Sequence, residues 1–184
     1  MMRSIEDLVK GTKELPYPSI GKDITIEEAV RIWKAVGEFV YQNLLQNRIV
    51  SIPNIGKFAI HEEKIPVAHN PSRFYCRRTP IFQLSSRLTR HFRMKETNNL
   101  INGSRPEVSL NISTIAYMCH VPRFVVDVCI KEITAAVYRR LAENVRVELP
   151  FAGIGVVSIR RETYKILFQY KLLKRINETV IRSE

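Results

Sequence analysis

Acidic residues are missing from one long stretch of this sequence. Residues 64 to 95 contain eight lysines and arginines but no aspartate or glutamate, in a chain of net charge +11. Soluble proteins usually intersperse charges of both signs, so a stretch of one sign favours a surface that faces a polyanion. A solvated surface is the other interpretation. The candidate binding residues are Lys64, Arg73, Arg77, Arg78, Arg87, Arg90, Arg93 and Lys95.

Cysteine is scarce, and long apolar runs are absent. The three cysteines, Cys76, Cys119 and Cys129, form no Cys-x-x-Cys pair, which argues against a disulfide framework and a zinc knuckle and favours a reducing compartment. No apolar run approaches the roughly 18 residues that a membrane helix needs. The opening "MMRSIEDLVKG" has acids where a signal peptide would be apolar. We therefore expect a soluble protein that is neither secreted nor bound to a membrane.

Residues arranged for catalysis are also lacking. The four histidines are spread out without metal-ligand spacing, and no glycine-rich phosphate loop follows a strand. Glu62 and Glu63 are adjacent, but alternation along a strand would point their carboxylates to opposite faces. Cys119 and Cys129 lie on or beside apolar helix faces, where a buried small hydrophobe is the commoner role. The sequence predicts no enzyme, no metal and no cofactor.

The strongest local signal is a helix that begins after Thr25. Thr25 and Glu28 have the spacing of a capping box, and apolar residues, Trp33 among them, then recur at helical spacing for about twenty residues. Two short strands, "RIVSI" and "KFAIH", follow around a corner from Pro53 to Gly56, where proline fixes φ and glycine tolerates positive φ. Beyond the basic stretch, "TPIFQL" predicts a strand and "SSRLTRHFRM" a helix.

This unit of helix, strand, corner and strand occurs twice. A shift of 97 residues places Pro53 on Pro150, and a shift of 99 places Gly56 on Gly155. The upstream apolar stripe recurs as well. Two copies are too few for a solenoid, so the repeat predicts two similar small domains. We expect them at residues 1–95 and 109–184, joined by a polar linker at 96–108.

The second copy resembles a known family. Residues 114–159, "TIAYMCHVPRFVVDVCIKEITAAVYRRLAENVRVELPFAGIGVVSI", resemble the core of the bacterial HU/IHF family, and the first copy does so through "VSIPNIGKFAI". The tandem arrangement is similar to the paired HU-like domains of the eukaryotic coiled-coil domain-containing protein 81 family. The resemblance covers nearly the whole chain, and its matching stretches are Ile32-Trp33, Glu38-Phe39-Val40, Ile52-Pro53 with Gly56 and Phe58, and Thr79-Pro80-Ile81-Phe82.

The resemblance implies an α+β fold in which two HU/IHF-like domains form an intramolecular pseudo-dimer. HU proteins grip DNA with two basic β-arms, each tipped by a wedging proline. Here "RRETYKILFQY" leaves the second copy only a tight hairpin, and the first copy's segment is shorter than the family's arm, so no two-armed clamp is expected. Asn70-Pro71 lies about where the family's arm tip carries Asn-Pro, but a plain turn is the favoured interpretation.

The resemblance also implies a ciliary or centrosomal context. We expect a non-catalytic structural or adaptor protein of a ciliary (axonemal) or centrosomal microtubule assembly, in the cytoplasm and cytoskeleton. Its basic face would dock to tubulin or to other axonemal or centrosomal proteins. HU-type nucleic-acid binding, with a nuclear location, is the alternative, because charge alone does not separate DNA from an acidic protein surface.

Overall fold

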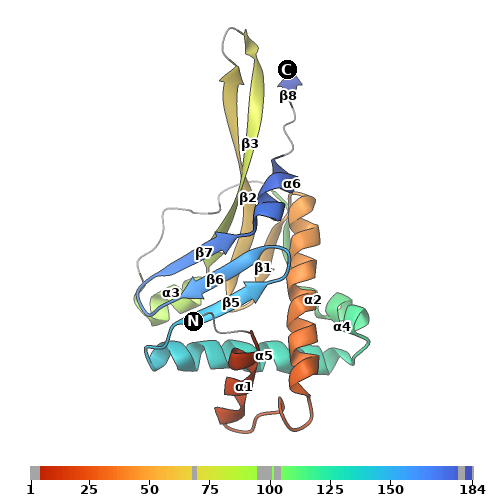
Figure 1. The fold of residues 1–184 in the computed structure, drawn as a ribbon, viewed down its shortest axis with the longest axis vertical. Helices are drawn as coiled ribbons and strands as arrows, with labels where there is room; N and C mark the ends of the chain where they lie inside the picture. Colours follow the sequence, from red (N-terminus) through yellow and green to blue (C-terminus); the bar gives the residue numbers. More distant parts are fainter. Residues whose placement is uncertain (1–4, 68–69, 95–100, 102–104, 178–180, 184) are drawn as a thin grey trace.

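The computed structural model describes residues 5–67, 70–94, 101, 105–177 and 181–183, but not the side chains of 67, 70–73 and 181–183. The helices are α1 (Ile5–Gly11), η1 (Thr12–Glu14, a 3-10 helix), α2 (Ile26–Leu45), α3 (Ser86–His91), α4 (Ile112–Cys119), α5 (Arg123–Ala142) and α6 (Tyr170–Ile176). The strands are β1 (Ile49–Ile52), β2 (Gly56–Val67), β3 (Asn70–Leu84), β4 (Glu107–Ser109), β5 (Val147–Phe151), β6 (Gly155–Ile159), β7 (Tyr164–Phe168) and β8 (Ile181–Ser183). This mixture of helices and antiparallel-rich sheets confirms the α+β class (Figure 1).

The internal duplication is visible in the order of the elements. The first repeat consists of the helices α1 and α2, the strands β1 to β3 and the short helix α3. The second repeat has the same order: the helices α4 and α5, the strands β5 to β7 and the short helix α6. Equivalent backbone hydrogen bonds recur: the Ser85 N–H donates to Ile55 O at 2.9 Å, and the Gln169 N–H donates to Ile154 O at 2.7 Å. Ser85 and Gln169 each directly precede the short helix of their repeat.

The helix α2 begins where the sequence predicts. The Glu28 N–H donates to Thr25 Oγ1 at 3.1 Å, and the Thr25 N–H donates to Glu28 Oε2 at 3.3 Å, so both halves of the capping box are formed. This pairing satisfies amide groups that the first helical turn leaves without partners. The apolar stripe that follows is buried in the core, with Trp33 only 1% exposed.

The two corners align differently from the sequence prediction. Ile52 pairs with Gly56 in the first corner, and Phe151 pairs with Gly155 in the second, so Ile52 corresponds to Phe151. Pro150 therefore lies inside β5 and is not the counterpart of Pro53. The expected match of Pro53 with Pro150 is wrong, because the two repeats are already related by a shift of 99 residues, and not 97, at the strands β1 and β5.

Two residues are inserted before β5. Asn47 and Asn144 follow their helices with φ of 57° and 60°, so the shift of 97 still holds there.

In the first corner the left-handed residue is Asn54, with φ of 61°, and not Gly56 as expected. Gly56 is needed instead for close approach, since a Cβ there would lie 2.4 Å from Gln83 O.

The second half of the chain supplies both edge strands of the first sheet. This sheet has the order β4-β1-β2-β3-β8, and the second sheet has the order β5-β6-β7. Strand β4 pairs in parallel with β1, placing Val108 beside Val50, and β8 pairs antiparallel with β3, placing Ile181 beside Tyr75. The strands β4 and β8 thus connect the two repeats through backbone pairing.

The hairpins of the two repeats differ greatly in length. Strands β2 and β3 pair from Gly56 and Leu84 out to Val67 and Asn70, and Figure 1 shows this hairpin projecting from the body as an arm. The expectation of a plain turn at Asn70-Pro71 is wrong, because β3 begins at Asn70, which pairs with Val67, and beyond a bulge the cross-strand pairs run from Phe74 with Pro66 to Leu84 with Gly56. Residues 68 and 69, between the strands, lie outside the described residues.

The equivalent hairpin of the second repeat is short, as predicted. Strand β6 ends at Ile159 and β7 begins at Tyr164, and the Arg160 N–H closes the turn by donating to Thr163 O at 2.8 Å. The described part of the chain therefore carries a single arm, which belongs to the first repeat.

The two repeats share one hydrophobic core. Trp33 of α2 packs on Phe151 of β5 with ring centroids 5.3 Å apart, and its indole N–H donates to Pro150 O at 2.7 Å. Phe58 of β2 contacts the same Phe151 ring at 4.9 Å. Because these aromatic side chains bury large apolar areas between the repeats, the contact confirms an intramolecular pseudo-dimer.

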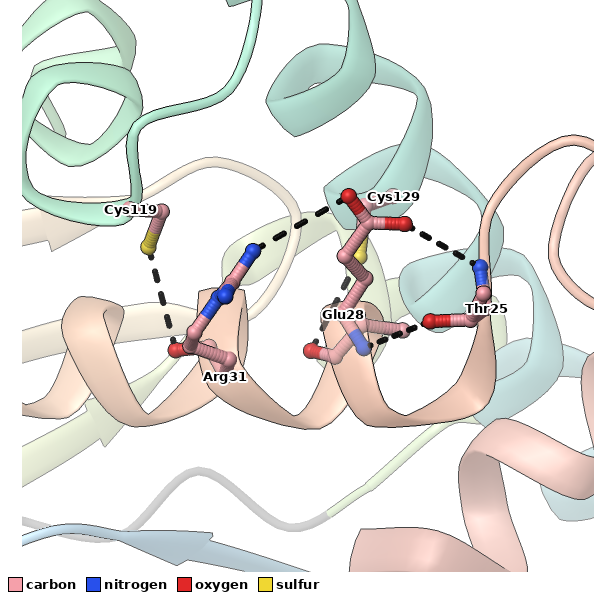
Figure 2. Close-up of polar contacts among 6 residues, drawn as sticks. Thr25, Glu28, Arg31, Cys119 and Cys129 are labelled. Atoms are coloured by element: carbon pink, nitrogen blue, oxygen red, sulfur yellow. Dashed lines mark hydrogen bonds and ion pairs between the residues drawn. The ribbon is translucent and has the colours of Figure 1, made fainter.

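Helix α2 also packs closely on the helices of the second repeat. Figure 2 shows Cys119 and Cys129 facing α2, where their Sγ atoms lie 3.9 Å from Arg31 O and Ala29 O, respectively. Both thiols are buried, as the sequence predicts, and these small side chains allow the helix backbones to approach.

A carboxylate of α5 fixes the loop before α2. Glu132 accepts hydrogen bonds from the Ser19 N–H at 2.7 Å and from the Ile20 N–H at 3.0 Å. Hydrogen bonds to an ionised carboxylate are stronger than neutral ones, so this contact helps to order a first-repeat loop against a second-repeat helix.

Candidate polyanion-binding surface

The root of the arm is held by a network around Glu62. Its Oε1 accepts from Arg78 Nε at 2.8 Å and from Asn47 Nδ2 at 3.3 Å, and its Oε2 lies 3.5 Å from Arg105 Nη2. The backbone N–H of Arg78 donates to the Oδ1 atom of Asn177, the residue directly after α6, at 3.0 Å. Arg78 therefore works inside the molecule, tying the arm to the segment before β4 and to the second repeat.

Further out, the arm alternates between charged and apolar pairs. Arg77 stands directly opposite Glu63 on one face, and the next pair on that face is Ile65 with Tyr75. Ile65 and Tyr75 are 38% and 39% exposed. Glu62 and Glu63 point to opposite faces, as predicted, so they form no carboxylate pair.

Lys64 lies on the face that carries Glu62. Its Nζ is 4.4 Å from the centroid of the Phe74 ring, a cation–π contact, and its register partner is Cys76. The backbone of Arg73 pairs with Ser183 of β8. The Arg73 side chain and the whole of Lys95 lie outside the described residues.

The remaining candidates lie on α3 and directly after it. Arg87 Nη1 donates to Asn54 Oδ1 at 3.1 Å, whereas Arg90 and Arg93 are exposed and form no ion pair with the residues that the structure describes. Figure 1 places α3 at the side of the body, above α5 and far from the distal end of the arm. The candidates that the structure describes thus fall in two places, on the arm and on α3 with the residue Arg93 that follows it.

Helix α3 is seated on the second repeat by aromatic side chains. His91 and Phe92 contact Tyr138 of α5, with ring centroids 5.8 and 6.0 Å apart. Burial raises the pKa of the Tyr138 hydroxyl, and the nearby charge of Arg87 opposes this rise. The packing fixes the direction in which α3 presents Arg90 and Arg93.

The second repeat carries a basic helix that the sequence analysis missed. Helix α6 is the counterpart of α3, and its exposed cations are Lys171, Lys174 and Arg175. The signal was present in the sequence, because the weaker basic character of residues 160–184 falls on this element. A shift of 84 residues, which places Ser85 on Gln169, would have aligned the two helices.

The described residues hold no cluster of three histidine, cysteine, aspartate or glutamate side chains that could bind a metal ion. Among the described helices, none alone is long and apolar enough to cross a membrane. Only α4 and α5, counted together across a bend of 109°, meet the criteria of length and composition.

Two family profiles match the chain in tandem. Residues 6–96 match the CCDC81 eukaryotic HU domain 1, and residues 106–180 match the CCDC81 eukaryotic HU domain 2. Together the matches span both repeats, in the order that the profiles have in their family.

Proposed function

Because this chain belongs to the CCDC81 family of paired eukaryotic HU domains, we propose that it is a non-catalytic structural adaptor of a ciliary or centrosomal microtubule assembly. HU-like domains are typically non-catalytic. The proposal gives the protein a cytoplasmic, cytoskeletal location and an acidic docking partner, such as a tubulin surface. Docking takes place through the cations of α3.

The observation that carries this proposal is the difference in length between the β2–β3 hairpin and the β6–β7 hairpin. An HU-type clamp holds bent DNA from both flanks, and bending costs of order 1 to 6 kcal/mol that contacts on each flank must offset. The arm of the first repeat has no counterpart in the second, where Arg160 to Thr163 close a tight turn. A one-armed module grips one side of a duplex only.

The distribution of free charge supports docking through α3. On the arm, Arg78 is bound to Glu62, and Arg77 stands opposite Glu63. Arg90 on α3 and Arg93 directly after it are exposed and form no ion pair with the residues that the structure describes. An acidic surface would meet these two side chains without displacing an existing partner.

HU-type nucleic-acid binding is the second candidate, and the arm favours it. The arm is longer than the sequence analysis expected, and Pro71 lies near its distal end, where HU proteins carry their wedging residue. This candidate requires a preference for nicked or bent duplexes that depends on Pro71.

Co-sedimentation with microtubules tests the adaptor function. The double variant Arg90→Gln/Arg93→Gln should bind roughly tenfold more weakly and with a flatter salt dependence, because each lost cation removes a charge contact. The control is Lys171→Gln/Lys174→Gln, which removes the same charge from the equivalent helix α6 and should change affinity less than about twofold. Equal losses in both variants would reduce the α3 surface to non-specific attraction.

A parallel titration with intact and nicked duplex DNA separates the two candidates. The adaptor predicts weak, salt-sensitive binding of equal strength to both duplexes, unchanged by Pro71→Ala. A strong preference for nicked DNA that disappears in Pro71→Ala would put the nucleic-acid function first.

A further inference from the structure

The outer face of the second sheet is open and hollowed. This face, which points away from the shared core, carries Val156, Ser158, Lys165 and Leu167 from β6 and β7. A cavity of about 510 Å³ lies over these residues. Leu167 is 73% exposed, an unusual degree for a leucine inside a sheet, so the floor of the cavity offers an apolar contact to solvent.

The rim of this cavity is basic. Arg146 is already engaged, since its Nη2 lies 2.6 Å from Glu148 Oε1 and its Nε donates to Ser158 Oγ at 2.8 Å. Arg160 and Lys165 are exposed and have no ion-pair partner among the residues that the structure describes. The rim therefore has two cations available to a ligand, and its one carboxylate is neutralised by Arg146.

A second hollow of about 410 Å³ continues the first along the edge of β5. The two hollows share Glu148 and Val156, and the second is lined further by Trp33, Lys34 and Phe151. Its lining is predominantly apolar. The outer face of the second sheet thus forms one groove, which is basic at the β6–β7 turn and apolar beside α2.

In the first repeat, described residues of β4 and of the segment before it contact the equivalent face, while β4 itself extends the sheet at its edge. Strand β4 lies along β1, and its Glu107 reaches Lys57 Nζ at 2.8 Å. The Ile101 N–H donates to Gln83 Oε1 at 3.3 Å, and Ala59 on this face is only 2% exposed. By pairing register, Lys57 and Gln83 are the counterparts of Val156 and Leu167.

We propose that the groove on the second sheet binds an extended acidic peptide segment of a partner protein. Its carboxylates pair with Arg160 and Lys165, much as Glu107 pairs with Lys57 on the equivalent face of the first sheet, and an apolar side chain packs on Leu167 and Val156. A nucleic acid fits this groove less well, because the floor is apolar and Glu148 lies inside it. The site is separate from α3 and the arm, so it stands independently of the proposed microtubule docking.

The test is an anisotropy titration of the full chain with a labelled peptide of alternating glutamate and leucine, about eight residues long so that it spans five-residue strands. We expect saturable binding that Arg160→Glu/Lys165→Glu weakens at least about tenfold. Leu167→Ser, at an exposed position that leaves the fold intact, should weaken it about fivefold. The control Lys10→Glu/Lys22→Glu makes the same charge change on α1 and its following loop and should alter the affinity less than about twofold.

Two results would overturn the proposal. One is an affinity that the groove variants and the control lower equally, which would indicate attraction to net charge alone. The other is a single-stranded oligonucleotide that binds more tightly than the peptide and loses its affinity in the same groove variants, which would assign the groove to nucleic acid.

Discussion

At the scale of single residues, Cys129 couples the stability of the fold to alkaline pH. Burial raises the pKa of its thiol from 9.0 to about 12, and the neighbouring Glu132 adds to this rise. An unfolded thiol ionises near pH 9, whereas the folded one stays neutral, so its contribution to stability is complete below pH 9 and is lost as the pH rises toward 12.

The prediction is a change in the pH dependence of unfolding. Between pH 8 and 10.5, the free energy of unfolding in urea should fall by about 2 kcal/mol less in Cys129→Ala than in the original chain. The comparison uses slopes, because the cavity left by the substitution lowers stability at every pH. Cys76→Ala, which removes a thiol from the arm, serves as control, and an identical slope in all three proteins would contradict the prediction.

Gly37 is a second residue on which the packing of the repeats depends. A Cβ at this position of α2 would lie 2.4 Å from the backbone nitrogen of Ala152, in the corner of the second repeat. Gly37→Ala should therefore destabilise the protein by about 1 to 3 kcal/mol, despite the better helix propensity of alanine.

Gly11 provides the matched comparison. A Cβ there would meet only the end of the flexible Arg140 side chain, at 2.5 Å, which can move aside. Gly11→Ala should change the free energy of unfolding by less than about 0.5 kcal/mol, measured in the same urea titration. If the two alanine variants were equally stable, the contact at Gly37 would not limit the approach of the repeats.

At the scale of elements, the arm depends on the network at its root. Glu62→Gln would leave Arg78 and Arg105 without their carboxylate, so we expect a loss of about 1 to 2 kcal/mol and faster amide hydrogen exchange in β2 and β3. Glu63→Gln removes the same charge from the neighbouring exposed position, and its exchange rates should match those of the original chain. Equal protection of the arm in both variants would exclude a positioning role for Glu62.

Local elements could be predicted from the sequence, but pairing between distant segments could not. The capping box at Thr25 and the apolar stripe of α2 involve neighbours within a few residues, so their spacing identifies them. The arm was missed because its length depends on cross-strand pairs such as Glu62 with Arg78, which a linear pattern does not reveal. The strands β4 and β8 are three residues each, too short for a periodic signal.

The same reasoning explains what was predicted of the candidate surface. The absence of acids in residues 64–95 identified the basic side chains, but it could not show their partners. Arg78 forms an ion pair with Glu62, and Arg105 forms an ion pair with the same carboxylate; Glu62 and Arg105 both lie outside that stretch. The groove on the second sheet was missed because Leu167 follows strand alternation, and only the fold shows that nothing in the described residues covers it.

At the scale of the whole molecule, the repeats should not fold as independent units. Trp33 and Phe58 of the first repeat pack on Phe151 of the second, and β4 belongs to the sheet of the first repeat. Expressed separately, residues 1–105 and 106–184 should each be unstable or self-associate. Mixing them should restore the buried environment of Trp33, the single tryptophan, measured by its fluorescence. Two stable, monomeric halves without mutual affinity would contradict this prediction.

The strand exchange also has a consequence for biosynthesis. Ser183 of β8 pairs with Arg73 of β3 in the arm. Strand β8 therefore leaves the ribosome about 110 residues after the part of β3 with which it pairs. At roughly 5 to 20 residues per second, the edge of β3 stays uncovered for several seconds or more during translation. An uncovered strand edge is a template for pairing with another chain. Because β8 is synthesised last, the nascent protein is most exposed to misassembly at the β2–β3 arm, the element that projects from the body of the finished molecule.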